Sequence, residues 1–80
     1  MICELKGLKF RSIMGSDVSR DGMFLELAED SNHANLLLEV FYSDRDGSMT
    51  LSAFAEAIPL PIVQEFISEA QRRLPPKTPP

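Results

Sequence analysis

The chain predicts an α+β fold: a four-stranded antiparallel β-meander followed by one C-terminal α-helix that packs on one face of the sheet. Three observations lead to this prediction. Apolar and polar residues alternate through most of residues 2–55, which is typical of half-buried strands. The tripeptide Arg-Asp-Gly occurs twice between apolar runs, at 20–22 and 45–47. After Pro61 the apolar spacing changes to that of an amphipathic helix.

Four alternating runs form the expected strands, and short polar segments separate them. The first run, residues 2–14, changes phase at Gly7, where a bulge would absorb one extra residue. The other three runs cover residues 23–28, 36–42 and 49–55. Asp-Gly between such runs is a strong hairpin signal, because a type I′ turn needs positive φ at both central residues. We therefore expect a hairpin with this turn at each Arg-Asp-Gly tripeptide.

Residues 31–42 also fit a helix, with Ser31 as its cap. The apolar face of that helix would consist of Ala34, Leu37, Leu38 and Phe41. A short apolar run satisfies both the strand and the helix pattern. We favour the strand and keep the helix as the alternative for this segment.

The C-terminal helix is marked by apolar residues at helical spacing. Its apolar stripe consists of Val63, Phe66, Ile67, Ala70 and Leu74. Pro61 suits the first turn, where a missing N–H costs nothing. Glu69 and Arg73 form an i,i+4 pair in the favourable order. These features predict a helix that presents one apolar face to the sheet.

The length indicates one domain, which we place at residues 1–74, with a disordered proline-rich tail at residues 75–80. Eighty residues are close to the size at which a single core is only just sufficient, so self-association would add useful buried area. The first residues lack the apolar core of a signal peptide, and no stretch is long enough to cross a membrane. We expect a cytoplasmic protein with no membrane contact.

The net charge of −4 is unevenly distributed along the chain. Residues 21–69 carry ten acidic residues against Arg45 alone, whereas both ends of the chain are net basic. An acidic surface disfavours a phosphate backbone, which requires clustered Lys and Arg, so we expect no nucleic-acid partner. It favours a basic protein partner through electrostatic steering and complementarity.

The sequence shows no catalytic signature. Cys3 and His33 are the only residues of their types, and neither has a neighbour at zinc-ligand spacing. The chain has no glycine-rich phosphate loop and no nucleophile elbow. We therefore predict that the protein is not an enzyme and has no cofactor.

One segment resembles the central part of an EF-hand calcium loop. The residues that align with loop positions three, five, six and nine are Asp44, Asp46, Gly47 and Thr50. The first position, normally Asp, is Tyr42, and the twelfth, normally Glu, is Ala53. Those two positions carry much of the coordination of calcium. A calcium-responsive protein that uses Asp44, Asp46 and Thr50 is therefore kept as an alternative function.

One helix covers only one face of the sheet, and strand phase predicts which residues lie on each face. The residues expected beneath the helix are Leu25, Leu27, Leu36, Leu38, Val40, Met49 and Leu51. The residues expected on the opposite face are Phe24, Glu26, Leu37, Glu39, Phe41, Thr50, Ser52 and Phe54. Three phenylalanines on an uncovered face indicate an interface. A register error of one residue would exchange the two faces.

These observations predict a small acidic, non-catalytic protein-binding module of the inhibitor, immunity or adaptor type, with a basic partner. The expected partner-binding residues are Phe24, Glu26, Leu37, Glu39, Phe41 and Phe54. A structural homodimer with no other ligand, formed through the same face, is a further alternative. The sequence does not identify the partner.

Overall fold

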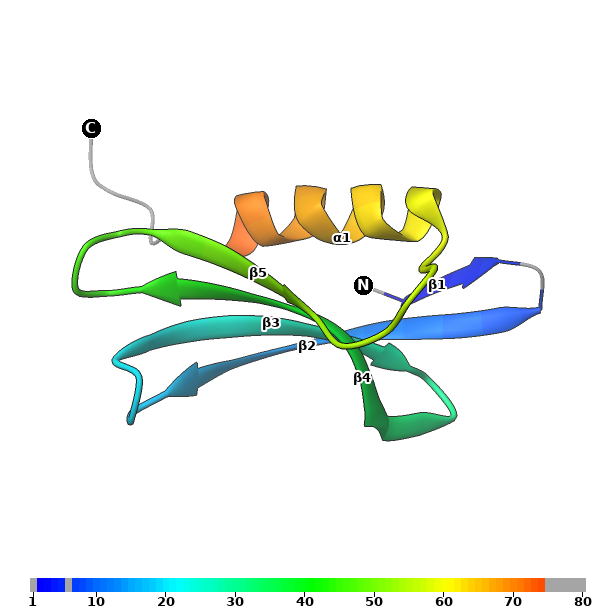
Figure 1. The fold of residues 1–80 in the computed structure, drawn as a ribbon, viewed down its shortest axis with the longest axis horizontal. Coiled ribbons are helices and arrows are strands. Elements are labelled where there is room, and N and C mark those ends of the chain that lie inside the picture. Colours follow the sequence, from blue (N-terminus) through cyan, green and yellow to red (C-terminus); the bar gives the residue numbers. More distant parts are fainter. Residues whose placement is uncertain (1, 6, 75–80) are drawn as a thin grey trace.

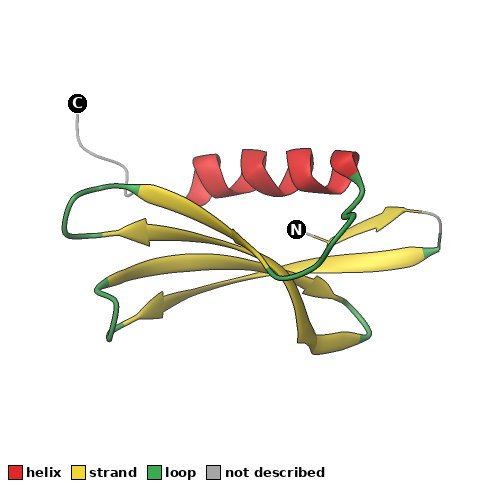
Figure 2. Ribbon diagram, viewed as in Figure 1, coloured by secondary structure: helices red, strands yellow, loops and turns green. Residues whose placement is uncertain are grey.

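The computed structural model describes residues 2–5 and 7–74, which form one antiparallel sheet with a helix on one face (Figure 1, Figure 2). The strands follow one another in chain order as β1-β2-β3-β4-β5. Their bounds are β1 Ile2–Leu5, β2 Leu8–Asp17, β3 Gly22–Glu29, β4 Asn32–Ser43 and β5 Met49–Ala53, and helix α1 spans Leu60–Arg73. The α+β meander with a C-terminal helix is therefore confirmed. The tail expected at residues 75–80 lies outside the described residues.

The sheet has five strands rather than the four expected. Residues 2–14 do not form one bulged strand, because the chain reverses at Gly7, whose φ is +80°. Ile2 then pairs with Arg11, and Leu5 with Leu8. The change of phase at Gly7 therefore marks a tight turn, which a glycine in the left-handed region permits.

Both Arg-Asp-Gly tripeptides lie at hairpins, as expected, but neither forms a type I′ turn. In the first turn Asp21 alone has a positive φ, 55°, and Gly22 already belongs to β3. In the second turn only Gly47 is left-handed, with φ 74°, and its N–H donates to Ser43 O at 2.8 Å. Each loop is longer than two residues, so one left-handed residue is enough to reverse the chain.

Residues 32–43 form strand β4, which confirms the strand interpretation over the helix. Its pairing with β3 shifts near Ala28: Leu38 pairs with Leu27, whereas Leu36 pairs with Ala28. Leu37 is therefore the extra residue of a β-bulge. The bulge breaks the simple alternation on which the predicted faces depended.

The hydrophobic core lies between α1 and the sheet. Its buried residues are Phe10, Leu25, Leu27, Leu37, Leu38, Val40, Ile62, Phe66, Ala70 and Leu74. Ile62 is fully buried, although the sequence pattern did not include it in the apolar stripe of the helix. Val63 and Ile67, which the pattern did include, are only half-buried. Met49 and Leu51 were expected in this core, but they stay exposed because α1 leaves a groove along β5.

One charged residue of α1 is also buried. Glu69 is 2% exposed, and the Ser12 hydroxyl donates to its carboxylate oxygens at 2.8 and 3.1 Å. Arg73 forms an ion pair with the same carboxylate, which confirms the expected i,i+4 pair. Burial raises the pKa of Glu69, but the hydrogen bonds from Arg73 and Ser12 act in the opposite direction, and the net result is a lowered pKa.

Candidate protein-binding face

The face of the sheet opposite α1, called the open face below, carries two rows of side chains across neighbouring strands. In one row Ile13 pairs with Glu26 and Glu26 with Glu39, which in turn pairs with Ser52. In the other row Gly15 pairs with Phe24, Phe24 with Phe41, and Phe41 with Thr50. The register thus confirms that Phe24, Glu26, Glu39 and Phe41 share one face.

Two of the three phenylalanine rings of the open face, Phe24 and Phe41, lie over glycines. A Cβ atom on Gly15 would be 2.6 Å from Cζ of Phe24, and one on Gly22 would be 2.5 Å from Cζ of Phe41. Only glycine leaves room for a ring this close to the backbone, and the ring in turn covers the glycine. Phe24 and Phe41 are consequently half-buried, and much of their apolar surface is used within the sheet.

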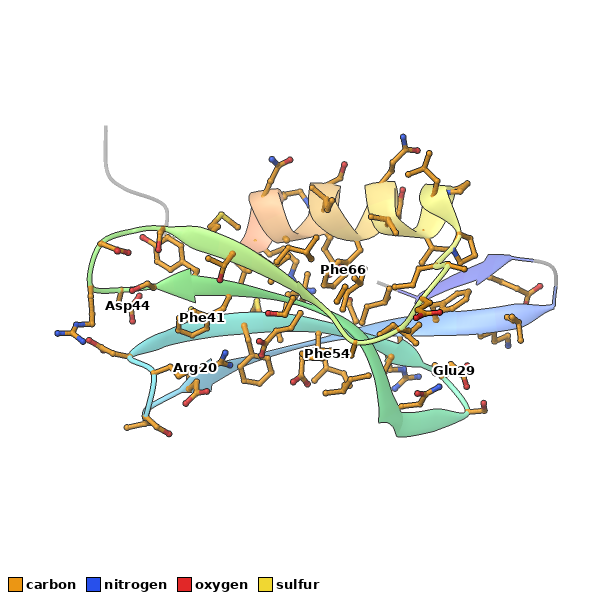
Figure 3. All side chains as sticks on the ribbon, in the orientation of Figure 1. Arg20, Glu29, Phe41, Asp44, Phe54 and Phe66 are labelled. Carbon is orange, nitrogen blue, oxygen red and sulfur yellow. The ribbon has the colours of Figure 1, made fainter. Side chains whose placement is uncertain are left out.

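Arg20, from the turn between β2 and β3, also covers the open face (Figure 3). Its guanidinium carbon lies 4.2 Å from the centroid of the Phe41 ring. Its Nη1 and Nη2 donate to the two Glu39 carboxylate oxygens at 3.0 and 2.8 Å, and its Nε donates to Asp17 at 2.6 Å. The hydrogen bonds to Glu39, and to a lesser extent those to Asp17, raise the pKa of Arg20. The hydrogen bonds that Arg20 donates lower the pKa of Asp17. Glu39 is 9% exposed, and its charge is already paired with that of Arg20 within the domain.

Glu26 is the carboxylate of this face that forms no ion pair among the described residues. It lies directly across from Glu39, and within residues 2–5 and 7–74 it makes no hydrogen bond or ion pair. Burial raises the pKa of Glu26, and the negative charge of Glu39 raises it further, while Arg20 lowers it. A half-buried carboxylate without a partner is unfavourable when it is charged. Among the described residues, Glu26 is therefore the open-face carboxylate without a hydrogen bond or an ion pair.

The remaining two expected contact residues differ from each other. Leu37 is 7% exposed and belongs to the core cluster, so it offers almost no surface to a partner. Its burial follows from the bulge, which removes it from the alternation of β4. Phe54 is 58% exposed, and its N–H donates to Leu37 O at 2.9 Å, so it continues the ladder one residue past β5. Phe54 is therefore the exposed apolar anchor of the open face.

The residues of the calcium alternative are not gathered into one loop. Asp46 Oδ1 accepts the Ser48 N–H at 2.9 Å, a bond that lowers the pKa of Asp46 and closes its own turn. Thr50 lies within β5, across from Phe41. Among the described residues, no group of three or more His, Cys, Asp or Glu side chains is placed to hold a metal ion. Calcium binding by Asp44, Asp46 and Thr50 stays a prediction.

Sequence reasoning missed the role of Arg20 and of the two glycines. Glu26 and Glu39 lie directly opposite each other on neighbouring strands, where two negative charges repel unless a cation lies nearby. That need for a cation was the signal that could have pointed to Arg20. The contacts of Gly15 and Gly22 depend on the cross-strand register, which the sequence does not specify.

Comparison with known proteins adds no functional information. No protein-family model, no curated protein and no solved structure matches this chain. The helix in the described part of the chain is too short and too polar to cross a membrane. The geometry of the open face is therefore the basis on which a function can be assigned.

Proposed function

We propose that this protein is a non-catalytic protein-binding module of the inhibitor, immunity or adaptor type, and that its open face binds a basic partner. The observation that carries the proposal is Glu26, a half-buried carboxylate with a raised pKa and with no ion pair or hydrogen bond among the described residues. A lysine or arginine of the partner would provide that cation. The net charge of −4 supports the proposal, because it steers a basic protein towards this surface.

The other residues of the open face fit a small contact surface around Glu26. Phe54 provides the apolar anchor, and the exposed Thr50 and Ser52 form a polar rim along β5. Arg20 already holds Glu39, so a cation from the partner would have Glu26 as its uncompensated carboxylate. Binding at this face requires no cofactor, and we place the protein in the cytoplasm as part of the same proposal.

A peptide titration tests the proposal without a known partner. The probe is the capped basic peptide acetyl-Arg-Leu-Lys-Leu-amide, and the matched control is the same peptide with Glu in place of Arg and Lys. We expect the basic peptide to shift the backbone amide signals of Glu26 and its neighbours on β2, β4 and β5 in ¹⁵N-labelled protein. The acidic peptide should leave them unchanged.

Two variants locate the binding. Glu26→Gln removes the proposed partner charge, whereas Glu65→Gln removes the same charge from an exposed position on α1. We expect Glu26→Gln to abolish the shifts and Glu65→Gln to preserve them. Shifts that survive in Glu26→Gln, or that appear only on α1, would show that the open face is not the binding surface.

A further inference from the structure

Strand β5 is the outer strand of the sheet, and its outer edge is unprotected in the described part of the chain. All five of its residues are exposed, including Leu51 at 50%. The strand Met49–Ala53 contains no charged residue and no proline, which are the usual devices that stop a further strand from pairing at a sheet edge. By contrast, the other edge strand, β1, has only four residues and carries the exposed Glu4.

The ladder with β4 shows which backbone groups of β5 point outward. Ser43 N–H donates to Ser48 O, and Phe54 N–H donates to Leu37 O, each at 2.9 Å. In an antiparallel ladder successive residues alternate between facing the neighbouring strand and facing away. Positions 48, 50, 52 and 54 therefore face β4. The residues whose N–H and C=O point away from the sheet are Met49, Leu51 and Ala53.

An apolar groove runs beside this edge on the helix side. Its apolar lining consists of Val40, Met49, Leu51, Ile67 and Ala70. The side chains of Met49 and Leu51 lie between α1 and open solvent, and the described residues leave them partly uncovered. A strand added to β5 would extend the sheet beneath this groove and cover these side chains.

We propose that β5 pairs with β5 of a second copy of this chain, antiparallel, about a two-fold axis that passes through Leu51. This register places Leu51 opposite Leu51 of the second copy, and Met49 opposite the second copy's Ala53. These are the residues with outward-facing backbone groups, so each pair exchanges both N–H···O bonds. One continuous sheet then runs through both copies, and apolar side chains meet on the helix side.

The symmetry of this register supports a second copy as the occupant. Leu51 is the central residue of β5, so each copy offers the other the same outward-facing backbone groups at Met49, Leu51 and Ala53. The net charge of −4 on each chain opposes association, but β5 itself is uncharged, so the new ladder places no like charges opposite each other.

The test is the solution mass of the full chain as a function of concentration, by sedimentation velocity. We expect wild type to form a dimer. Leu51→Lys places two ammonium groups opposite each other at the axis, and we expect the dimer dissociation constant to rise at least about tenfold. Leu60→Lys is the matched control, because Leu60 is an exposed leucine of α1, away from the edge, and its variant should dimerise like wild type. Circular dichroism shows that both variants are folded.

Amide hydrogen exchange identifies the interface without a substitution. We expect the amides of Met49, Leu51 and Ala53 to be protected only at concentrations at which the dimer forms. Thr50 and Ser52, whose N–H groups face β4, should be protected at all concentrations. A wild type that stays monomeric, a dimer that Leu51→Lys leaves intact, or freely exchanging amides of Met49, Leu51 and Ala53 in the dimer would overturn the proposal. The peptide titration distinguishes this proposal from the proposed function, because we expect the Leu51→Lys variant to bind the basic peptide like wild type.

Discussion

The two faces of the sheet are packed in different ways. On the helix side, aliphatic residues such as Leu25 and Leu27 are fully buried against Phe66 and Ile62 of α1. On the open face no second layer is present among the described residues, and the sheet covers itself by laying Phe24 and Phe41 over glycines and Arg20 over Phe41. An apolar open face is therefore only a weak sign of an interface. The carboxylate of Glu26, which stays unpaired among the described residues, is a more informative sign of a binding surface.

The glutamates of the two faces show the same contrast. Glu69, beneath α1, has Ser12 and Arg73 as hydrogen-bond partners and a lowered pKa. Glu26, on the open face, has no such partner in the described chain and a raised pKa. The described residues thus provide hydrogen-bond partners for the buried carboxylate of Glu69 and none for the more accessible carboxylate of Glu26. We interpret this difference as the distinction between a structural carboxylate and a binding carboxylate.

The largest expected effect compares one ring from each face. Phe66→Ala removes a fully buried ring and should lower the free energy of unfolding by about 3–5 kcal/mol. Phe41→Ala removes a half-buried ring and should cost about 1–2 kcal/mol. Urea denaturation of both variants measures the two costs. Equal costs would contradict the view that the helix side holds most of the stability.

The next effect concerns the buried carboxylate. Glu69→Gln should lower the free energy of unfolding at pH 7 by about 2 kcal/mol, because it weakens the charge-assisted bonds from Ser12 and Arg73. The pKa of Glu69 is lower in the folded state, so its contribution is complete above the unfolded pKa and is lost as the pH falls through the folded pKa. Urea denaturation across this range should show the two proteins converging in acid. A constant difference at every pH would refute this role.

Removal of the Arg20 cation from the open face should have a smaller effect. Arg20→Met leaves the buried Glu39 without its bidentate partner and should cost about 1–2 kcal/mol. Arg45→Met, in the other hairpin turn, is the matched control and should change stability by less than about 0.5 kcal/mol. Thermal unfolding measures both. If the two variants behave alike, Arg20 does not hold the open face together.

The smallest effect has the opposite sign. Glu26→Gln should stabilise the domain at pH 7 by less than about 1 kcal/mol, because it removes an unpaired half-buried charge. An acid whose pKa is raised on folding binds its proton more tightly in the folded state, so wild type gains stability as the pH falls through the folded pKa. The advantage of the variant should therefore disappear in acid. Thermal unfolding at neutral and acidic pH measures it, and a destabilised variant at pH 7 would contradict the account.

The sequence predicts features set by local pattern and misses those set by pairing. Alternation and Asp-Gly were enough to find the two Arg-Asp-Gly hairpins and the shared face of Phe24, Glu26, Glu39 and Phe41, and helical spacing was enough to find α1. The extra strand, the bulge at Leu37 and the position of Ile62 depend on register and on how the helix sits on the sheet. The contacts of Arg20 depend on a side chain that crosses from a turn to β4, and local periodicity carries no information about such a contact.

The proposed function requires that the Glu26 carboxylate has no paired cation in the free protein and gains one when a partner binds. Measurement of the pKa of Glu26 tests this most directly. Carbon-13 NMR of the side-chain carboxyl gives the pKa of Glu26 in the free protein and with the basic peptide bound. We predict a pKa above the ordinary value of 4.5 in the free protein, for which Glu69 is the internal reference with a lowered pKa. The bound peptide should lower the pKa of Glu26. A free pKa at or below the ordinary value, or one that the peptide leaves unchanged, would contradict the proposed function.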